Sequence, residues 1–104
     1  MAKAKTERRT FSGEQQAVYD AVLESARQGG MKVQSADAAT GVVQLSKGIS
    51  MRTWGEAIDV RVQPAAPGQV DVSASAKAKF QVVDWGQSQK TLDGFFFRLD
   101  RILR

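Results

Sequence analysis

Hydrophobic positions recur with helical spacing at the start of the folded region. The run consists of Val18, Ala21, Val22 and Ala26. Intervals of three and four residues are typical of a helix with one buried face. Ser12 and Gln15 have the S-x-x-Q form of a capping box, and Gly29–Gly30 supplies a helix stop. These signals predict a helix over residues 13–28.

A second helical stripe closes the chain. Its members are Leu92, Phe95, Phe96, Leu99, Ile102 and Leu103. They follow the i, i+3, i+4, i+7 pattern of an amphipathic helix, which we expect over residues 88–103. Phe97 falls outside this stripe.

Four extended runs lie between the two predicted helices, at residues 31–35, 42–51, 57–62 and 70–80. In the last run, Val and Ala alternate with Asp, Ser and Lys, as expected for a strand with one buried face. Turns are predicted at 37–41, where Gly41 supplies the unusual backbone angle, and at 53–56. Another is predicted at 64–68, where two prolines should end the ladder. Gly48 is a candidate bulge.

This order of elements predicts the α+β class: a two-layer sandwich of helix, four-stranded antiparallel meander and helix, with both helices on one sheet face. Small alanines on the last strand should admit the large side chains of the final helix. The length, 104 residues, suits one domain. We expect a disordered basic tail over residues 1–10 and a single domain over residues 11–104.

The positive charge is concentrated in the tail. The chain has a net charge of +4, and its first nine residues hold Lys3, Lys5, Arg8 and Arg9 against the single acid Glu7. Those residues predict a weak electrostatic contact with nucleic acid or an anionic membrane, or alternatively a solubilising tail. A nearly neutral folded body weakens the nucleic-acid interpretation.

Several kinds of catalysis are excluded by composition. The chain contains neither cysteine nor histidine, so thiol nucleophiles and triads with an imidazole base cannot form. A zinc site would need carboxylates alone, which zinc rarely accepts. We therefore expect no enzymatic activity, no metal and no cofactor. Without an apolar leader or a spanning segment, a cytoplasmic location is the default.

Four short motifs resemble a group of proteins. They are Asp37-x-x-Thr40-Gly41, Trp54-Gly55-Glu56-x-Ile58-x-Val60-x-Val62, the strand of residues 70–76, and Asp84-Trp85-Gly86 before the final helix. Over residues 11–103 the chain is similar to small, uncharacterised bacterial α+β domains of unknown function. The resemblance implies the fold and no established reaction. In those domains arginines and serines are frequent where this chain has Lys77 and Lys79.

Six residues are candidate binding residues. Trp54 and Trp85 lie beside glycines in predicted loops, either as contact residues or as plugs at the edge of the core. Arg61, Lys77 and Lys79 could form a basic patch on the open sheet face, unless Asp59 and Asp71 neutralise it through cross-strand pairs. Phe97 could be a partner or dimer contact, or could wrap over the sheet edge.

The sequence therefore favours a non-catalytic binding or interaction module. Asp84 is expected to stabilise the turn before the final helix, because a lone carboxylate is not a mechanism. Two alternatives stay open. One is an electrostatic binder of RNA or anionic membrane that uses the tail and the open sheet face. The other is a small-molecule carrier with a cavity between sheet and helix.

Overall fold

The computed structural model describes residues 5–48, 55–78 and 87–104. Within these residues the chain forms five strands and two helices. In chain order they are β1 (Lys5–Ser12), α1 (Gln15–Gln28), β2 (Met31–Asp37), β3 (Val42–Lys47), β4 (Glu56–Ala66), β5 (Gln69–Ala78) and α2 (Gln87–Leu103).

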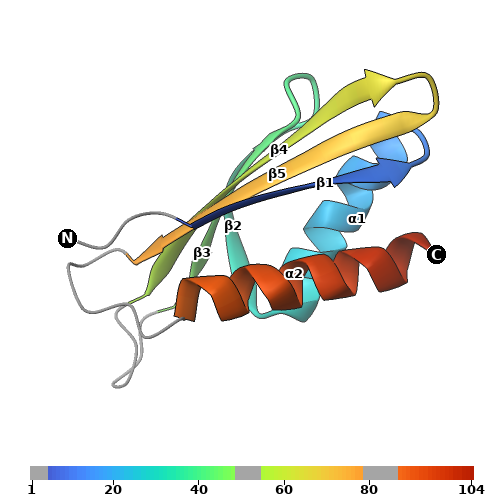
Figure 1. Ribbon diagram of the computed structural model, residues 1–104. Helices are drawn as coiled ribbons and strands as arrows, with labels where there is room; N and C mark the ends of the chain where they lie inside the picture. The colour runs from blue at the N-terminus through green and yellow to red at the C-terminus, as the bar shows by residue number, and fades with distance from the viewer. Residues whose placement is uncertain (1–4, 49–54, 79–86) are drawn as a thin grey trace.

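The strands form one antiparallel sheet in the order β1-β5-β4-β3-β2, with both helices packed together on one of its faces (Figure 1). Helix α2 contacts β5 and β1, whereas α1 contacts β2, β4 and β5. The predicted α+β class and the two-layer arrangement are confirmed. The sheet, however, has five strands rather than four.

The additional strand is β1, and it corrects the prediction of a disordered tail from Lys5 onward. Its ladder with β5 runs from the pair Lys5–Ala76 to the pair Ser12–Gln69. On the helix side, Phe11 stacks on Phe96 with ring centroids 6.5 Å apart. The strand lacks apolar alternation because charged side chains also occupy this side, where the Arg9 guanidinium lies 4.8 Å from the Phe96 ring centroid. A guanidinium can cover an aromatic face and stay hydrated at its rim.

The first helix begins without the predicted capping box. Ser12 pairs in the β1–β5 ladder instead, and Glu14 is the N-cap residue with no side-chain cap bond. Gly13, at φ 134°, turns the chain between strand and helix and donates its N–H to the Gly68 carbonyl at 2.9 Å. Gln15 donates its side-chain amide to the Val62 carbonyl at 3.0 Å. Ser12, through the backbone ladder, and Gln15, through its side chain, thus contact the sheet instead of capping the helix.

The β4–β5 hairpin extends beyond its predicted turn. Strand β4 continues through Pro64, which pairs with Val70, and a bulge lies between Pro64 and Ala66. The prediction that the prolines end the ladder is wrong, because a proline is tolerated at a bulge. Gly48 lies after the last residue of β3. The other described register shift is in β2, between Val33 and Ser35.

The core lies between the sheet and the two helices, and large side chains from α2 fill its centre. Phe95 and Phe96 are fully buried and meet edge to face, with ring centroids 5.3 Å apart. On the β5 side, Ala74 and Ala76 are also fully buried. The predicted pairing of a small-residue strand with a helix of large residues is confirmed.

Candidate functional site

The outward face of α2 carries the most exposed large hydrophobic side chain of the described residues. Phe97 is 61% exposed, whereas its neighbours Phe95 and Phe96 are completely buried. The difference follows from geometry, since successive residues of a helix point about 100° apart and a third aromatic cannot share the inward stripe. Of the two alternatives, the structure places Phe97 in solvent rather than over the sheet edge.

Charged side chains flank Phe97 on the same face. Asp93 lies one turn before it and accepts a hydrogen bond from Gln89 at 2.9 Å. Arg101 lies one turn after it, with its guanidinium 5.8 Å from the Phe97 ring centroid. An arginine over an aromatic ring orders both side chains while leaving the other ring face accessible.

Two contacts through Ser25 hold α2 against α1. The buried Ser25 hydroxyl donates to the Phe95 carbonyl at 2.8 Å, and Arg98 donates its Nε–H to the Ser25 carbonyl at 3.0 Å. The Arg98 guanidinium lies so close to Gly29, at the end of α1, that a Cβ atom there would be 2.2 Å from Nη2. Partial burial lowers the pKa of Arg98 from its usual value. Cations favour helix C-termini, so this residue both caps α1 and positions α2.

A third contact joins α2 to the sheet. Thr91 donates its hydroxyl to the Glu56 carboxylate at 2.7 Å, and both residues are buried. The other carboxylate oxygen, Oε2, accepts no hydrogen bond from the part of the chain that the structure describes. Breaking the hydrogen bond from Thr91 would leave the buried Glu56 carboxylate without this donor, which costs free energy. The Glu56–Thr91 hydrogen bond therefore fixes the first turns of α2 to β4. Sequence analysis did not single out this pair.

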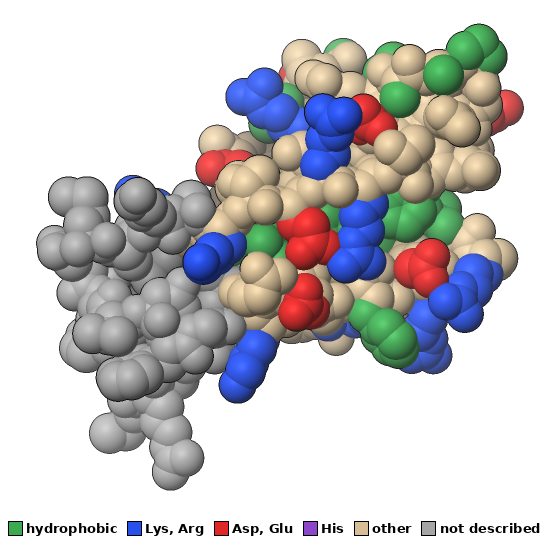
Figure 2. Space-filling view, in the orientation of Figure 1, with side chains coloured by type: hydrophobic (Ala, Val, Ile, Leu, Met, Phe, Trp, Pro, Cys, Tyr) green, Lys and Arg blue, Asp and Glu red, His purple; other side chains and the backbone are tan. Residues whose placement is uncertain are grey.

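The open face of the sheet does not form a basic patch over its described residues. Arg61 lies opposite Ser73, and Lys77 lies opposite Ala57. Asp71 accepts a hydrogen bond from Thr10 at 2.6 Å and forms an ion pair with Arg8 at 3.7 Å. Asp71 is therefore paired with a residue of β1, and no ion pair among the described residues joins Asp59 or Asp71 to Arg61 or Lys77. On the face that carries α2, positive and negative side chains are also interleaved (Figure 2).

The basic residues of the predicted tail are thus partly engaged within the fold. Arg9 forms an ion pair with Glu7 at 2.5 Å, in addition to its contact with Phe96. Lys5 lies in β1. Four predicted residues, Lys3, Trp54, Lys79 and Trp85, lie outside the described residues, as does Asp84.

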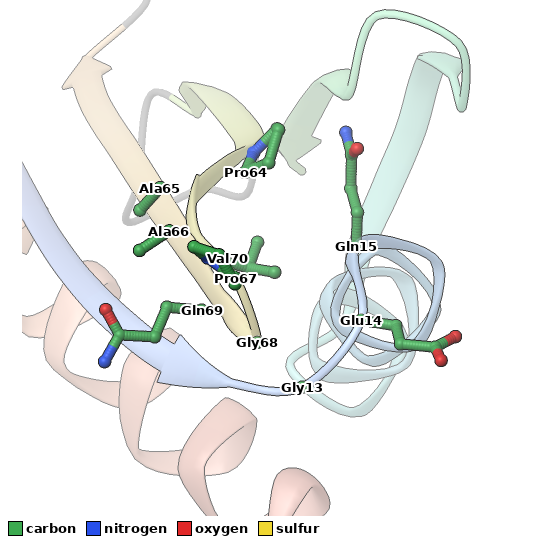
Figure 3. A pocket seen from close by; sticks show the side chains of 10 residues that line it. All are labelled: Gly13, Glu14, Gln15, Pro64, Ala65, Ala66, Pro67, Gly68, Gln69 and Val70. Atoms are coloured by element: carbon green, nitrogen blue, oxygen red, sulfur yellow. The ribbon is translucent and has the colours of Figure 1, made fainter.

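A groove that the sequence did not predict lies between the tip of the β4–β5 hairpin and the start of α1 (Figure 3). It has a volume of about 670 Å³ and its lining residues are Gly13, Glu14, Gln15, Pro64, Ala65, Ala66, Pro67, Gly68, Gln69 and Val70. The only charged member, Glu14, points away from the hairpin (Figure 3). An open groove without convergent polar side chains offers little to orient a small ligand.

The described residues contain neither a metal-binding cluster nor a membrane-spanning helix. No group of three or more acidic side chains is arranged to hold a metal ion within residues 5–48, 55–78 and 87–104. Neither helix in those ranges is long and apolar enough to cross a bilayer.

Solved structures resemble this chain at low sequence identity. No protein-family model matches it, and no curated protein does. The adenylate sensor of AMP-activated protein kinase, solved with the ribofuranotide ZMP, is 10% identical with a TM-score of 0.68, over 88% of this chain and 94% of that one. Ara h 8.0201 is 12% identical with a TM-score of 0.57, over 97% and 99% of the two chains.

A conserved protein of unknown function from Enterococcus faecalis, EF2215, is similar as well. It is 12% identical with a TM-score of 0.51, and the match covers 96% of this chain and 68% of that one. At these identities the likeness shows a shared fold. The chain is therefore distantly similar in structure to small α+β proteins, some of unknown function and one solved with a bound ligand.

Proposed function

We propose that this protein is a non-catalytic interaction module that binds a protein partner through the outer face of α2. The outer face of α2 is defined here by Lys90, Asp93, Phe97, Arg101 and Arg104. The observation that carries the proposal is the 61% exposure of Phe97 beside two fully buried phenylalanines. Burying a phenylalanine side chain stabilises a protein by about 1.5–3 kcal/mol, and the fold leaves most of this free energy available to a partner.

The platform beneath Phe97 also supports the proposal. Helix α2 is fixed to α1 through Ser25 and to β4 through the Glu56–Thr91 hydrogen bond. A side chain on an element held in this way loses little conformational freedom when it is bound. Aromatic and arginine side chains together, here Phe97 and Arg101, are the types that most often dominate protein interfaces.

The two alternative functions have weaker support. An electrostatic binder of RNA or membrane needs a stripe of positive charge, but Arg8 and Arg9 are paired with acids and the open sheet face is mixed. A carrier needs a cavity between α2 and the sheet, where Phe95 and Phe96 are packed. The tryptophans at positions 54 and 85 stay candidate contacts that the described structure does not address.

A quantitative affinity capture tests the proposal. The immobilised protein, its Phe97→Ala variant and a Val33→Thr control are each exposed to a lysate of cells that encode the protein. Val33, on β2, is the other exposed large hydrophobic residue among the described residues, at 44% exposed. We expect at least one protein, which can be a second copy of the chain, to be retained by the wild type and the control and lost at least tenfold with Phe97→Ala. Identical retention by all three, with each variant folded, would overturn the proposal.

A further inference from the structure

Three charges on the outer face of α2, those of Lys90, Asp93 and Arg101, have no ion-pair partner among the described residues. Asp100 and Arg104, nearby, form an i,i+4 ion pair at 2.6 Å. Asp93 is bound only by the neutral Gln89 amide, and Arg101 only approaches the Phe97 ring. Both side chains are exposed; Asp93 lies four residues before Phe97, and Arg101 lies four residues after it. Opposite charges therefore lie at equal distances along the helix on either side of an exposed aromatic.

This arrangement complements itself under a two-fold rotation. When two α2 helices pack antiparallel about an axis through Phe97, the residue four positions before the centre of one helix lies beside the residue four positions after the centre of the other. Asp93 of each copy then lies beside Arg101 of its partner, and the two Phe97 rings meet at the axis. Isologous interfaces require such a self-complementary patch.

We infer that the outer face of α2 binds a second copy of this chain, antiparallel and centred on Phe97; this inference rests on the proposed function. The residues at 93, 97 and 101 form one i±4 ridge, and packing the i±4 ridges of two helices together is the commonest class of helix crossing, near −50°. In that crossing the two ridges run side by side, which brings the opposite charges into contact.

The association is weak and reversible because the interface is small. One helix face buries less than the roughly 1,200 Å² at the lower limit of stable interfaces. Phe97 supplies the apolar centre, and the two charge pairs fix the direction of packing. Charged contacts at a rim set orientation more than affinity, so the direction is the part of the inference that mutations can test.

Sedimentation equilibrium of the full chain tests the inference. Protein at about 10 μM to 1 mM, the range suited to a weak dimer, is examined at low salt so that screening is limited. The wild type should self-associate, and Phe97→Ala should weaken the association at least tenfold. Asp93→Arg and Arg101→Glu, each alone, should weaken it about tenfold, because each places like charges together twice in the dimer.

Mixing the two charge variants gives the decisive measurement. In a mixed dimer of Asp93→Arg with Arg101→Glu, both contacts join opposite charges again, so the mixture should associate as strongly as the wild type. Lys32→Glu, at an exposed position on β2 and outside the proposed interface, is the matched control for a general change in charge. Each variant is first checked by thermal melting, since all of these side chains are exposed and the fold should persist.

Three outcomes overturn the inference. A wild type that stays monomeric at 1 mM excludes a second copy, and Phe97-dependent capture of another protein would then leave the proposed function intact. Self-association that neither charge variant changes excludes the antiparallel arrangement. Self-association that Phe97→Ala leaves unchanged, together with unchanged capture, refutes both the inference and the proposed function.

Discussion

The two helices lie on the same face of the sheet, yet their outward faces differ. On α1, Glu24 forms an ion pair with Arg27 and accepts a hydrogen bond from Gln28 at 3.0 Å. Gln16 donates to Asp20 at 2.9 Å. These pairs are three or four residues apart, so the helix satisfies them by itself. Helix α2 has similar local pairs, Gln89–Asp93 and Asp100–Arg104. It differs in that Phe97 is exposed and Arg101 has no ion-pair partner among the described residues.

The comparison shows which part of each helix the fold determines. Both inward stripes are buried, including Val18, Val22 and Ala26 on α1 and Phe95, Phe96 and Leu99 on α2. Packing therefore explains both inward faces equally. The outward faces have no such constraint, so an exposed aromatic on α2, which the described outward face of α1 lacks, points to different uses. The experiments below would break or sharpen this distinction.

The largest expected effect is a difference in stability between a substitution on the inward face of α2 and one on its outward face. Phe96→Ala removes a buried ring that contacts Phe11, Phe95 and Arg9. It should destabilise the protein by about 3–5 kcal/mol, through lost burial and the cavity left behind, or unfold it. Phe97→Ala should change stability by less than about 0.5 kcal/mol. Denaturant midpoints measure both variants, and equal destabilisation would place Phe97 in the core.

A smaller loss of stability is expected when β1 is shortened, and it should affect α2 more than α1. Deleting residues 1–9 removes part of the ladder with β5 and the Arg9 contact with Phe96. At about 0.5–1.5 kcal/mol for each net hydrogen bond, the loss should be about 2–4 kcal/mol. Amide exchange should accelerate more in α2, which packs on β1, than in α1. An unchanged midpoint would mean that β1 does not form in solution.

The smallest effect concerns the outward face of α1. Hydrogen bonds from Arg27, and then from Gln28, lower the pKa of Glu24 from 4.5 to about 2. A carboxylate with a lowered pKa stabilises the folded state above its unfolded pKa, and this contribution is lost as the pH falls through the folded pKa. The stability gap, meaning the difference in free energy of unfolding between the wild type and Glu24→Gln, should therefore be largest above pH 4.5. It should have nearly disappeared by about pH 2.

The control for this last experiment is salt. Both side chains are exposed, so the gap should be small and should shrink further in about 1 M sodium chloride, where the Debye length is near 3 Å. A gap that persists at low pH and high salt would contradict an electrostatic origin. Thermal melts across the pH range supply the measurement.

Most of the fold could be predicted from hydrophobic periodicity. Both helices, the meander and the alanine face of β5 follow from residues whose burial repeats at a fixed interval. Gly41 was recognisable in the sequence as the glycine of a predicted turn. The structure agrees, because Gly41 has φ 75° and a Cβ there would lie 2.0 Å from the Val62 carbonyl oxygen. The local sequence was enough to predict an element wherever the spacing of its hydrophobic residues determined its structure.

Strand β1 could not be predicted in this way, because its inward side chains are charged. Glu7 and Arg9 alternate with Thr6, Arg8 and Thr10, and the inward Arg9 is favourable because it covers the distant Phe96 ring and forms an ion pair with Glu7. Two threonines on one face of the strand, Thr6 and Thr10, were the available signal. The helix start was missed for a similar reason, since Ser12 and Gln15 bind the sheet rather than the helix.

The candidate site was predicted only in part. Phe97 was recognised because it breaks the inward stripe of α2. The contacts that fix α2, through Ser25, Glu56 and Thr91, join residues 35–73 positions apart, and no periodicity reveals them. Whether Arg61 and Lys77 have acidic neighbours could not be decided from the sequence, because it depends on which strands lie beside them.

The position of β1 has a consequence for the order in which the chain acquires its structure. Thr6 and Ser75, which share a 2.7 Å hydrogen bond, are 69 positions apart. When β1 leaves the ribosome, it therefore has no partner until β5 has been synthesised, and the Phe96 ring that it covers is not made until α2 follows. Pairings so distant in sequence slow folding. The meander of β2 to β5 can form first, leaving the edge of β5 open until β1 arrives to close the sheet.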